Sequence, residues 1–338
     1  MVAGVFEALL DELRALGGAA ENICLREGPL GRGLFAVDPA RPVALHVPAP
    51  LLIAADDMVF AHGALKVGPN VALGARARAF LDAYQRELGW GAEGRAEILR
   101  GFERVHALPQ SLRAELLARY DCGLWFEDIN EALIRRQFFD ARCISFAGRT
   151  TVMPFVELAN HGHGGDYLFE DGLALRGTFA GEVLVSYAPF DAFEFFRNWG
   201  FASDQPAALS IPVAGNVGAQ RLHIGRSFPA TKRVQRAWMP GLRRDAGEDA
   251  KELGLDYLMI GNLQYPRLAR GIFYHLMRDA GFEGFEEAFD LIRHVNQLHF
   301  LDLLEMLEGV SVPVAATMRQ MARLQLRAIS SSYGVRAI

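Results

Sequence analysis

The chain has 338 residues, which is enough for one large domain or two ordinary ones with a substantial buried core. Hydrophobic residues make up 51% and charged residues 22%, and the formal net charge is −5. This is a globular composition, and it argues against a protein built to grip a nucleic-acid backbone. The three cysteines are far apart, which disfavours both a structural zinc cluster and a disulfide framework.

Targeting and membrane signals are not evident in the sequence. The N-terminal stretch carries Glu7, Asp11 and Glu12 and lacks the basic and apolar regions of a secretory signal. No segment reaches the roughly 18 consecutive apolar residues of a membrane span. We therefore expect a cytoplasmic protein that binds neither membrane nor nucleic acid.

The first three segments alternate between residue patterns typical of helices and patterns typical of strands. Residues 1–19 predict a helix, because Val5, Leu9, Leu13 and Leu16 recur at helical spacing before a Gly-Gly stop. Residues 20–56 consist of short β-favouring runs broken by glycine and proline. Residues 57–140 return to helical spacing and predict a helical insertion.

The rest of the chain repeats this alternation. Residues 141–202 contain short β runs and then a helix, FDAFEFFRNW, that ends at Gly200. Residues 203–338 are mostly helical, with one candidate strand at QRLHIG. Because strands and helices do not alternate singly, a doubly wound parallel sheet is disfavoured and an α+β fold is predicted.

Two short segments first suggest other chemistry. ELANHGHGGD, residues 157–166, crowds carboxylate and imidazole groups as a metal site does, but a confident helix that would place Glu157 and His161 on one face is missing. GPLGRG, residues 28–33, resembles a phosphate-binding loop but is followed by a strand instead of a helix. We therefore predict no metal and no dinucleotide loop.

Five segments taken together are far more specific. GRGLFA at 31–36, R-x-F at 136–138, ELANH at 157–161, GExLxxY at 181–187 and WGF at 199–201 occur in this order. The chain thereby resembles SET-domain methyltransferases, and more narrowly the class of Rubisco large-subunit lysine methyltransferase and actin histidine methyltransferase. That resemblance implies a SET-type fold with a knot-like crossing, a helical insertion, and a helical substrate-binding domain after residue 202.

The resemblance also implies a cofactor, S-adenosylmethionine, with S-adenosylhomocysteine as product, and a role for individual residues. Tyr187 matches the catalytic tyrosine of the family. The implied cofactor-binding residues are Leu30, Arg32, Gly33, Arg136, Glu157, Asn160, His161, Tyr187 and Phe201. Arg136 would face the cofactor carboxylate, the Asn160-His161 segment would hold the adenine, and Phe201 would pack on it. Phe155 and Trp199 would contact the substrate.

The family pattern is broken at several positions. Glu157 replaces an aspartate, Ala188 a glycine, Ala192 an asparagine, and Trp199 a channel tyrosine. The function implied by the resemblance is N-methylation of a protein or peptide side chain, lysine ahead of histidine. A free amino acid or small metabolite as acceptor, and a SET scaffold that binds without turnover, stay open as alternatives.

Overall fold

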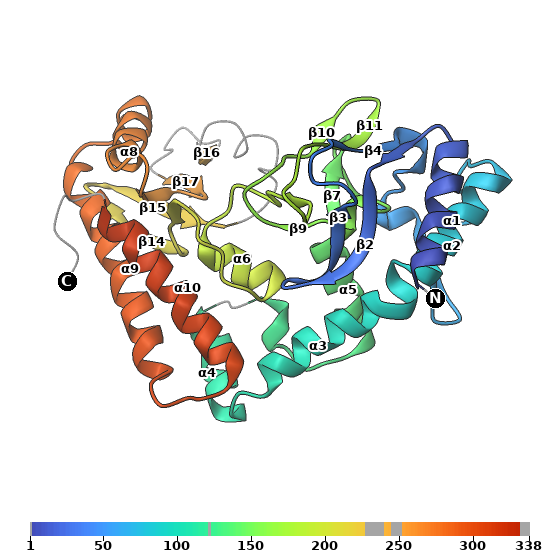
Figure 1. Ribbon diagram of the computed structural model, residues 1–338. Coiled ribbons are helices and arrows are strands. Elements are labelled where there is room, and N and C mark those ends of the chain that lie inside the picture. The colour runs from blue at the N-terminus through green and yellow to red at the C-terminus, as the bar shows by residue number, and fades with distance from the viewer. Residues whose placement is uncertain (1, 121–122, 227–239, 245–251, 332–338) are drawn as a thin grey trace. The chain divides into compact units, whose positions relative to one another are not determined.

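The structure is a computed structural model that describes residues 2–120, 123–226, 240–244 and 252–331 (Figure 1). The chain divides into two compact units. Unit 1 comprises residues 1–102 and 128–187, and unit 2 comprises residues 103–127 and 188–338. The predicted helical insertion is thus shared between the two units, because its middle part, 103–127, belongs to unit 2.

Unit 1 is built on short strands. One antiparallel sheet has the order β1 (Ala19–Glu21), β4 (Val43–Pro48), β11 (Gly172–Gly177) and β10 (Leu168–Phe169). Three hairpins are formed by β2 (Ile23–Gly28) with β3 (Gly31–Ala36), β5 (Met58–Ala61) with β6 (Ala64–Val67), and β7 (Cys143–Phe146) with β8 (Arg149–Val152). A parallel pair consists of β9 (Asn160–His161) and β12 (Leu184–Val185).

The helices of unit 1 are α1 (Val2–Ala15), α2 (Ala75–Glu87) and α5 (Glu131–Arg142), and α3 (Arg95–His106) crosses the boundary to unit 2. The predicted N-terminal helix is confirmed as α1, although Phe6 and Leu10 share its buried face. The predicted insertion, in contrast, begins with the β5–β6 hairpin. Its turn places His62 and Gly63 at positive φ, a conformation that ends helical structure.

The core of unit 1 is aromatic at its centre. Phe155 is fully buried and contacts the rings of Phe6, Phe80 and Tyr84. Its backbone lies at φ +62°, an uncommon conformation for a bulky residue. This strained turn brings the chain from β8 into a short 3₁₀ helix, Val156–Leu158, which leads directly into β9.

Unit 2 contains more strand than the sequence indicates. β13 (Ala207–Leu209) pairs with β18 (Met259–Asn262), and a mixed sheet has the order β14 (Val213–Val217), β15 (Gln220–Gly225), β17 (Glu252–Asp256) and β16 (Gly241–Arg244). The candidate strand QRLHIG is confirmed as β15. Its neighbour β17 runs parallel to it.

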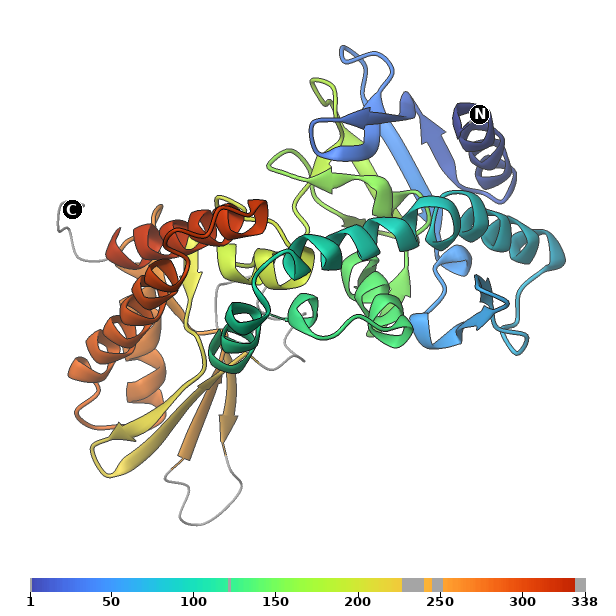
Figure 2. The ribbon, with the colours of Figure 1, turned by 90° about the horizontal axis from the view of Figure 1, so that it is seen from below.

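Among the described residues of unit 2, the helices are α4 (Gln110–Tyr120), α6 (Ala192–Trp199), α8 (Leu268–Asp279), α9 (Glu286–Met306) and α10 (Pro313–Ser330). α9 and α10 pack side by side (Figures 1 and 2). α6 ends as predicted at Gly200, which adopts φ +74°. The mixed α+β class with a helical C-terminal region is confirmed.

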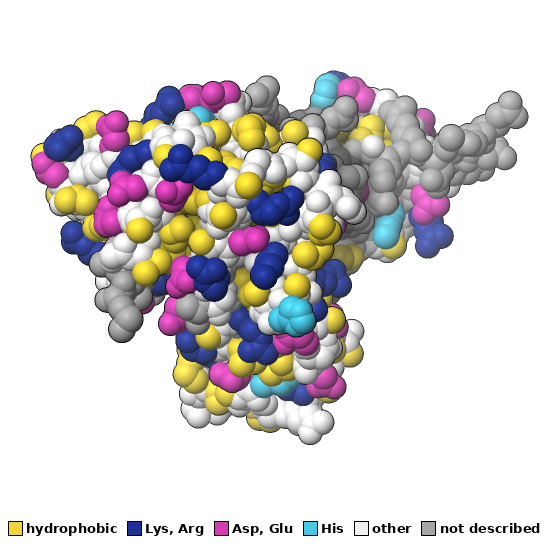
Figure 3. Space-filling view, turned by 90° about the vertical axis from the view of Figure 1, so that its right-hand side faces the viewer, with side chains coloured by type: hydrophobic (Ala, Val, Ile, Leu, Met, Phe, Trp, Pro, Cys, Tyr) yellow, Lys and Arg dark blue, Asp and Glu magenta, His cyan; other side chains and the backbone are white. Residues whose placement is uncertain are grey.

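One face of the molecule carries charges of both signs (Figure 3). On the face shown in Figure 3, Lys and Arg side chains are interspersed with Asp and Glu side chains instead of forming a patch of one sign. In the described part of the chain, none of the helices is both long and apolar enough to cross a bilayer.

Candidate active site

Three of the five sequence segments meet in unit 1. β3, which carries GRGLFA, is joined to the segment before β12 by hydrogen bonds from Val183 N to Leu34 O (2.8 Å) and from Ala36 N to Gly181 O (2.8 Å). β9, which carries Asn160 and His161, pairs with β12. β9 and β12 follow β3 in the sequence by about 125 and 150 residues, and the three strands together form one layer.

Asn160 fixes the centre of this layer with its side chain. Its Nδ2 donates to Glu182 Oε1 at 2.7 Å and to Arg32 O at 3.4 Å. A Cβ on Gly33 would lie 2.5 Å from that Nδ2 and 2.7 Å from Glu182 Oε1. Glycine is required at 33 because the carboxamide packs directly on the backbone. Glu182 was not among the predicted residues, although it is the glutamate of the GExLxxY segment.

Tyr187 is anchored at both its hydroxyl and its backbone. The hydroxyl donates to Ala159 O at 3.0 Å, and Tyr187 N donates to His161 Nδ1 at 3.3 Å. Burial raises the pKa of Tyr187 to about 12, while the Arg142 cation partly opposes this shift. The phenol is therefore protonated at neutral pH, so it can orient a reacting group but cannot act as a general base there.

His161 is held as a neutral ring. Its Nδ1 accepts from Tyr187 N, and burial, assisted by the neighbouring His163, lowers the pKa of His161 to about 4. The ring plane of His161 is tilted by 55° to that of Tyr187, with 5.2 Å between the centroids. His161 is half-buried, whereas His163 is exposed.

The lowered pKa of His161 predicts a stability profile. An unfolded histidine takes up a proton below about pH 6.5, whereas the folded one resists until about pH 4, so stability is lost as pH falls through this window. We expect the melting temperature to fall between pH 7.5 and 5.5, and to fall less in His161→Gln. Thermal melts of both proteins at these pH values test this. An equal fall in a His163→Gln control and in His161→Gln would contradict the assignment.

Tyr167 lies near Tyr187 and was not among the residues predicted from the sequence. Burial and the nearby Tyr187 raise the pKa of its phenol, so two uncharged phenols belong to the same region of unit 1. His163 and Asp166 are exposed, whereas Tyr167, which follows them directly, is half-buried.

Buried charges gather beside this layer. Arg32 has a side chain only 8% exposed and lies 3.4 Å from Glu97 Oε1, yet its Nε and Nη2 donate no hydrogen bond to a described residue. Arg142 also pairs with Glu97 and lies 3.9 Å from Glu157 Oε2. Two buried guanidinium groups therefore face two carboxylates, with donors left over on Arg32.

Glu157 turns into the core instead of toward the layer. Its Oε1 accepts from the Tyr84 hydroxyl at 2.7 Å, and its side chain is fully buried. Burial raises the pKa of Glu157, although Arg142 and the Tyr84 hydroxyl oppose this shift. The Glu157 carboxyl therefore acts as a buried hydrogen-bond acceptor in the core of unit 1. This geometry separates it from His161, and the described residues contain no cluster of three or more metal-ligating side chains.

Three of the predicted residues lie elsewhere in unit 1. Arg136 is on the exposed side of α5, with a 67% exposed side chain 3.7 Å from Asp140 Oδ2. Leu30 is exposed at the β2–β3 turn, and Phe155 is in the core. Arg142, six residues after Arg136 on α5, has a side chain only 15% exposed. The two arginines differ in exposure because only one face of α5 is buried.

The remaining predicted residues, Trp199 and Phe201, belong to unit 2. Trp199 ends α6 and contacts the rings of Phe190 and Phe195, and Phe201 also contacts Phe195. Asp191 begins the helix by accepting from Glu194 N at 2.8 Å. α6 thus presents an aromatic cluster at its C-terminal end.

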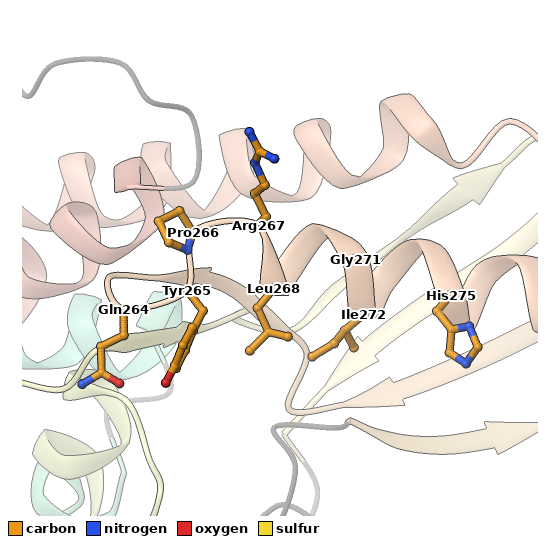
Figure 4. Close-up of a pocket in the computed structure, with 8 residues that line it drawn as sticks. All are labelled: Gln264, Tyr265, Pro266, Arg267, Leu268, Gly271, Ile272 and His275. Carbon is orange, nitrogen blue, oxygen red and sulfur yellow. The ribbon is translucent and has the colours of Figure 1, made fainter.

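An open pocket of about 720 Å³ lies along α8 in unit 2 (Figure 4). Tyr265, Leu268 and Ile272 point to one side of the chain, whereas Arg267 points away from them. Its ionisable groups, Tyr265, Arg267 and His275, are exposed. None of the predicted site residues lines this pocket, which lacks the buried, oriented polar groups of a catalytic site.

Comparisons with known proteins were informative only at the level of structure. No protein-family description matches the chain, and no curated protein matches it. Similar solved structures include the SET domain of LSMT bound to lysine and AdoHcy, with 15% identity, TM-score 0.43, and coverage of 98% of this chain and 90% of the other. Rubisco LSMT bound to AdoMet has the same identity and TM-score, with 96% and 90% covered. Rubisco LSMT bound to sinefungin and monomethyllysine has 16% identity, TM-score 0.43, and 97% and 90% covered.

Proposed function

We propose that this protein is a SET-type N-methyltransferase that uses S-adenosylmethionine and acts on a side-chain nitrogen of a protein or peptide, lysine ahead of histidine. The observation that carries the proposal is the anchored, protonated Tyr187 in the layer formed by β3, β9 and β12. Three sequence segments typical of SET enzymes converge in that layer. S-adenosylmethionine supplies an activated methyl group. The protein therefore needs to bind this cofactor, align it with the acceptor nitrogen and exclude water from the site.

The charge distribution of unit 1 fits this cofactor. Its amino-acid moiety carries a carboxylate, and Arg32 offers two buried donors that no described residue accepts. A buried guanidinium with spare donors is suited to a carboxylate. We therefore assign carboxylate recognition to Arg32 and Arg142 in place of Arg136. The β9 backbone beside Asn160 would hold the adenine, as the resemblance implies.

The acceptor proposal rests on the two phenols. Tyr187 and Tyr167 are uncharged at neutral pH and offer hydroxyl oxygens to an incoming amine. A lysine, with an unperturbed pKa of about 10.4, must lose a proton before it can attack, and desolvation lowers that pKa. A histidine ring is already neutral. The proposal therefore keeps both acceptors, with lysine ahead of histidine.

A labelling experiment tests the proposal. The full chain is incubated with S-adenosylmethionine carrying a labelled methyl group, together with either lysate proteins or a small-molecule extract. We expect label on protein, in residues that mass spectrometry identifies as methyl-lysine. Label confined to the low-mass fraction would shift the function to a small-metabolite methyltransferase. If no product carries the label and the protein does not bind the cofactor, the function would be that of a SET scaffold without catalytic turnover.

Substitution of Arg32 gives a second, activity-independent prediction. Arg32→Met keeps the length of the side chain but removes the donors, so we expect S-adenosylhomocysteine to bind about 10- to 100-fold more weakly. Arg136→Met should change the dissociation constant less than about twofold, because that side chain lies on the surface. Isothermal calorimetry measures both. The reverse pattern would restore the original assignment of Arg136.

A further inference from the structure

Glu182 contributes a carboxylate to the layer formed by β3, β9 and β12. The residue is half-buried, and its Oε1 accepts from Asn160 Nδ2 at 2.7 Å. Within the described parts of the chain, none of the ion pairs includes Glu182. The charge of a half-buried carboxylate that lacks a cation is screened less than that of an exposed ion pair. Glu182 therefore gives this layer a local negative charge.

The Glu182 carboxylate lies over two glycines of the GPLGRG segment. A Cβ on Gly33 would lie 2.7 Å from Glu182 Oε1, and a Cβ on Gly28 would lie 3.4 Å from Glu182 Oε2. A glycine-rich loop binds an anion through backbone N–H groups that no side chain covers. Here a carboxylate of the chain itself occupies the space above both glycines, so this part of the segment favours a cation over a phosphate.

Charges of opposite sign act on Tyr187 from two sides. Burial raises the pKa of Tyr187, the Arg142 cation lowers it, and the Glu182 carboxylate raises it. Arg142 shares one carboxylate partner with Arg32. Successive side chains of a strand point to opposite faces, so Arg32 lies on the face of β3 away from Gly33 and the Glu182 carboxylate. The surroundings of the phenol thus have a cationic side and an anionic side.

S-adenosylmethionine has the same polarity. Its amino-acid end carries a carboxylate, which suits the arginines, and its sulfur is a cationic sulfonium a few bonds away. When the methyl group is transferred, the nitrogen lone pair forms the new C–N bond and the electron pair of the C–S bond stays on sulfur. The product, S-adenosylhomocysteine, is therefore a neutral thioether at that position. A carboxylate directed at the sulfur stabilises the bound cofactor but has no charge to stabilise in the product.

We propose that Glu182 is the counter-charge of the cofactor sulfonium and raises the affinity for S-adenosylmethionine relative to S-adenosylhomocysteine. This inference rests on the proposed function, because it requires the cofactor to bind beside Tyr187. The sulfonium is favoured over an acceptor lysine as the partner of Glu182. A lysine must lose its proton before it attacks, and a nearby carboxylate would hold that proton on the amine. Asn160 fixes the carboxylate in place, and Glu182 acts through its charge.

Calorimetric titration of the full chain with S-adenosylmethionine and with S-adenosylhomocysteine tests the proposal. Glu182→Gln removes the charge but keeps an oxygen that accepts from Asn160. We expect this variant to bind S-adenosylmethionine about tenfold more weakly and S-adenosylhomocysteine within about twofold of the original protein. The matched control is Glu170→Gln, at a carboxylate of unit 1 that forms an exposed ion pair with Arg176. This control should change neither dissociation constant by more than about twofold.

Glu182→Asp separates the charge from the hydrogen bond. It keeps the carboxylate but withdraws it from Asn160 by one methylene group, so both ligands should bind more weakly and the ratio of their dissociation constants should be retained. An equal loss for both ligands in Glu182→Gln, or a ratio that changes as much in Glu182→Asp, would overturn the proposal and leave a structural role. An unchanged ratio with a raised KM for the acceptor would place the carboxylate at the acceptor instead. If the unaltered protein binds neither ligand, the proposed function itself fails.

Discussion

Tyr187→Phe is expected to reduce the rate of methyl transfer by about 10²- to 10³-fold while leaving cofactor binding within a few fold of the original protein. The substitution removes one oxygen, the hydroxyl that donates to Ala159 O at 3.0 Å, and keeps the ring that lies against His161. The loss should therefore appear in kcat. The folded state should lose only about 1 kcal/mol, the contribution of one hydrogen bond.

The pH dependence of the rate of methyl transfer distinguishes an orienting role of the Tyr187 hydroxyl from a role as general base. Because the pKa of Tyr187 is about 12, its hydroxyl does not ionise between pH 7 and 10, and any rise in rate over that range reports deprotonation of the acceptor. Tyr265→Phe, at an exposed tyrosine of unit 2, is the matched control and should be fully active. Full activity of Tyr187→Phe would refute the proposed role of the hydroxyl.

The sequence predicted elements where local patterning is strong. α1 and α6 were found because apolar spacing and a terminal glycine are local signals, and the α+β class followed from the alternation of textures. The β5–β6 hairpin and most strands of unit 2 were missed, because each has only a few residues and is stabilised by pairing partners distant in sequence.

The candidate site shows the same division. Asn160, His161, Gly33 and Tyr187 could be predicted as site residues because they belong to short ordered motifs, and the structure brings these motifs together in one layer. Arg136 was predicted and Arg142 was not, although both belong to α5, because the sequence does not show which face of this helix lies inward. Glu157 was predicted beside the cofactor, but its side chain turns to Tyr84, a partner 73 residues away. Side-chain direction depends on packing that no local pattern contains.

The strongest effect on stability is expected at Arg226, which holds α6 to the strands of unit 2. Its side chain is 5% exposed and donates to Glu194 Oε1 at 2.7 Å, to Asp191 Oδ2 at 3.2 Å, and to the carbonyl oxygens of Leu209 and Ser210. It also lies over the ring of Phe193. Both carboxylates are fully buried, so their charges are balanced chiefly by this one cation.

Arg226→Met should therefore lower the free energy of unfolding by about 3–5 kcal/mol, because it leaves two buried carboxylates without their cation. Arg221→Met, at an arginine with a 64% exposed side chain that lies 3.7 Å from Glu252, should cost less than about 0.5 kcal/mol. Urea unfolding monitored by circular dichroism measures both. Combining Arg226→Met with Asp191→Asn and Glu194→Gln should recover a large part of the loss, because the penalty comes from unpaired charge. If the triple variant is as unstable as the single one, packing of the guanidinium on Phe193 and its bonds to the backbone carbonyls hold α6 in place, and ion pairing does not.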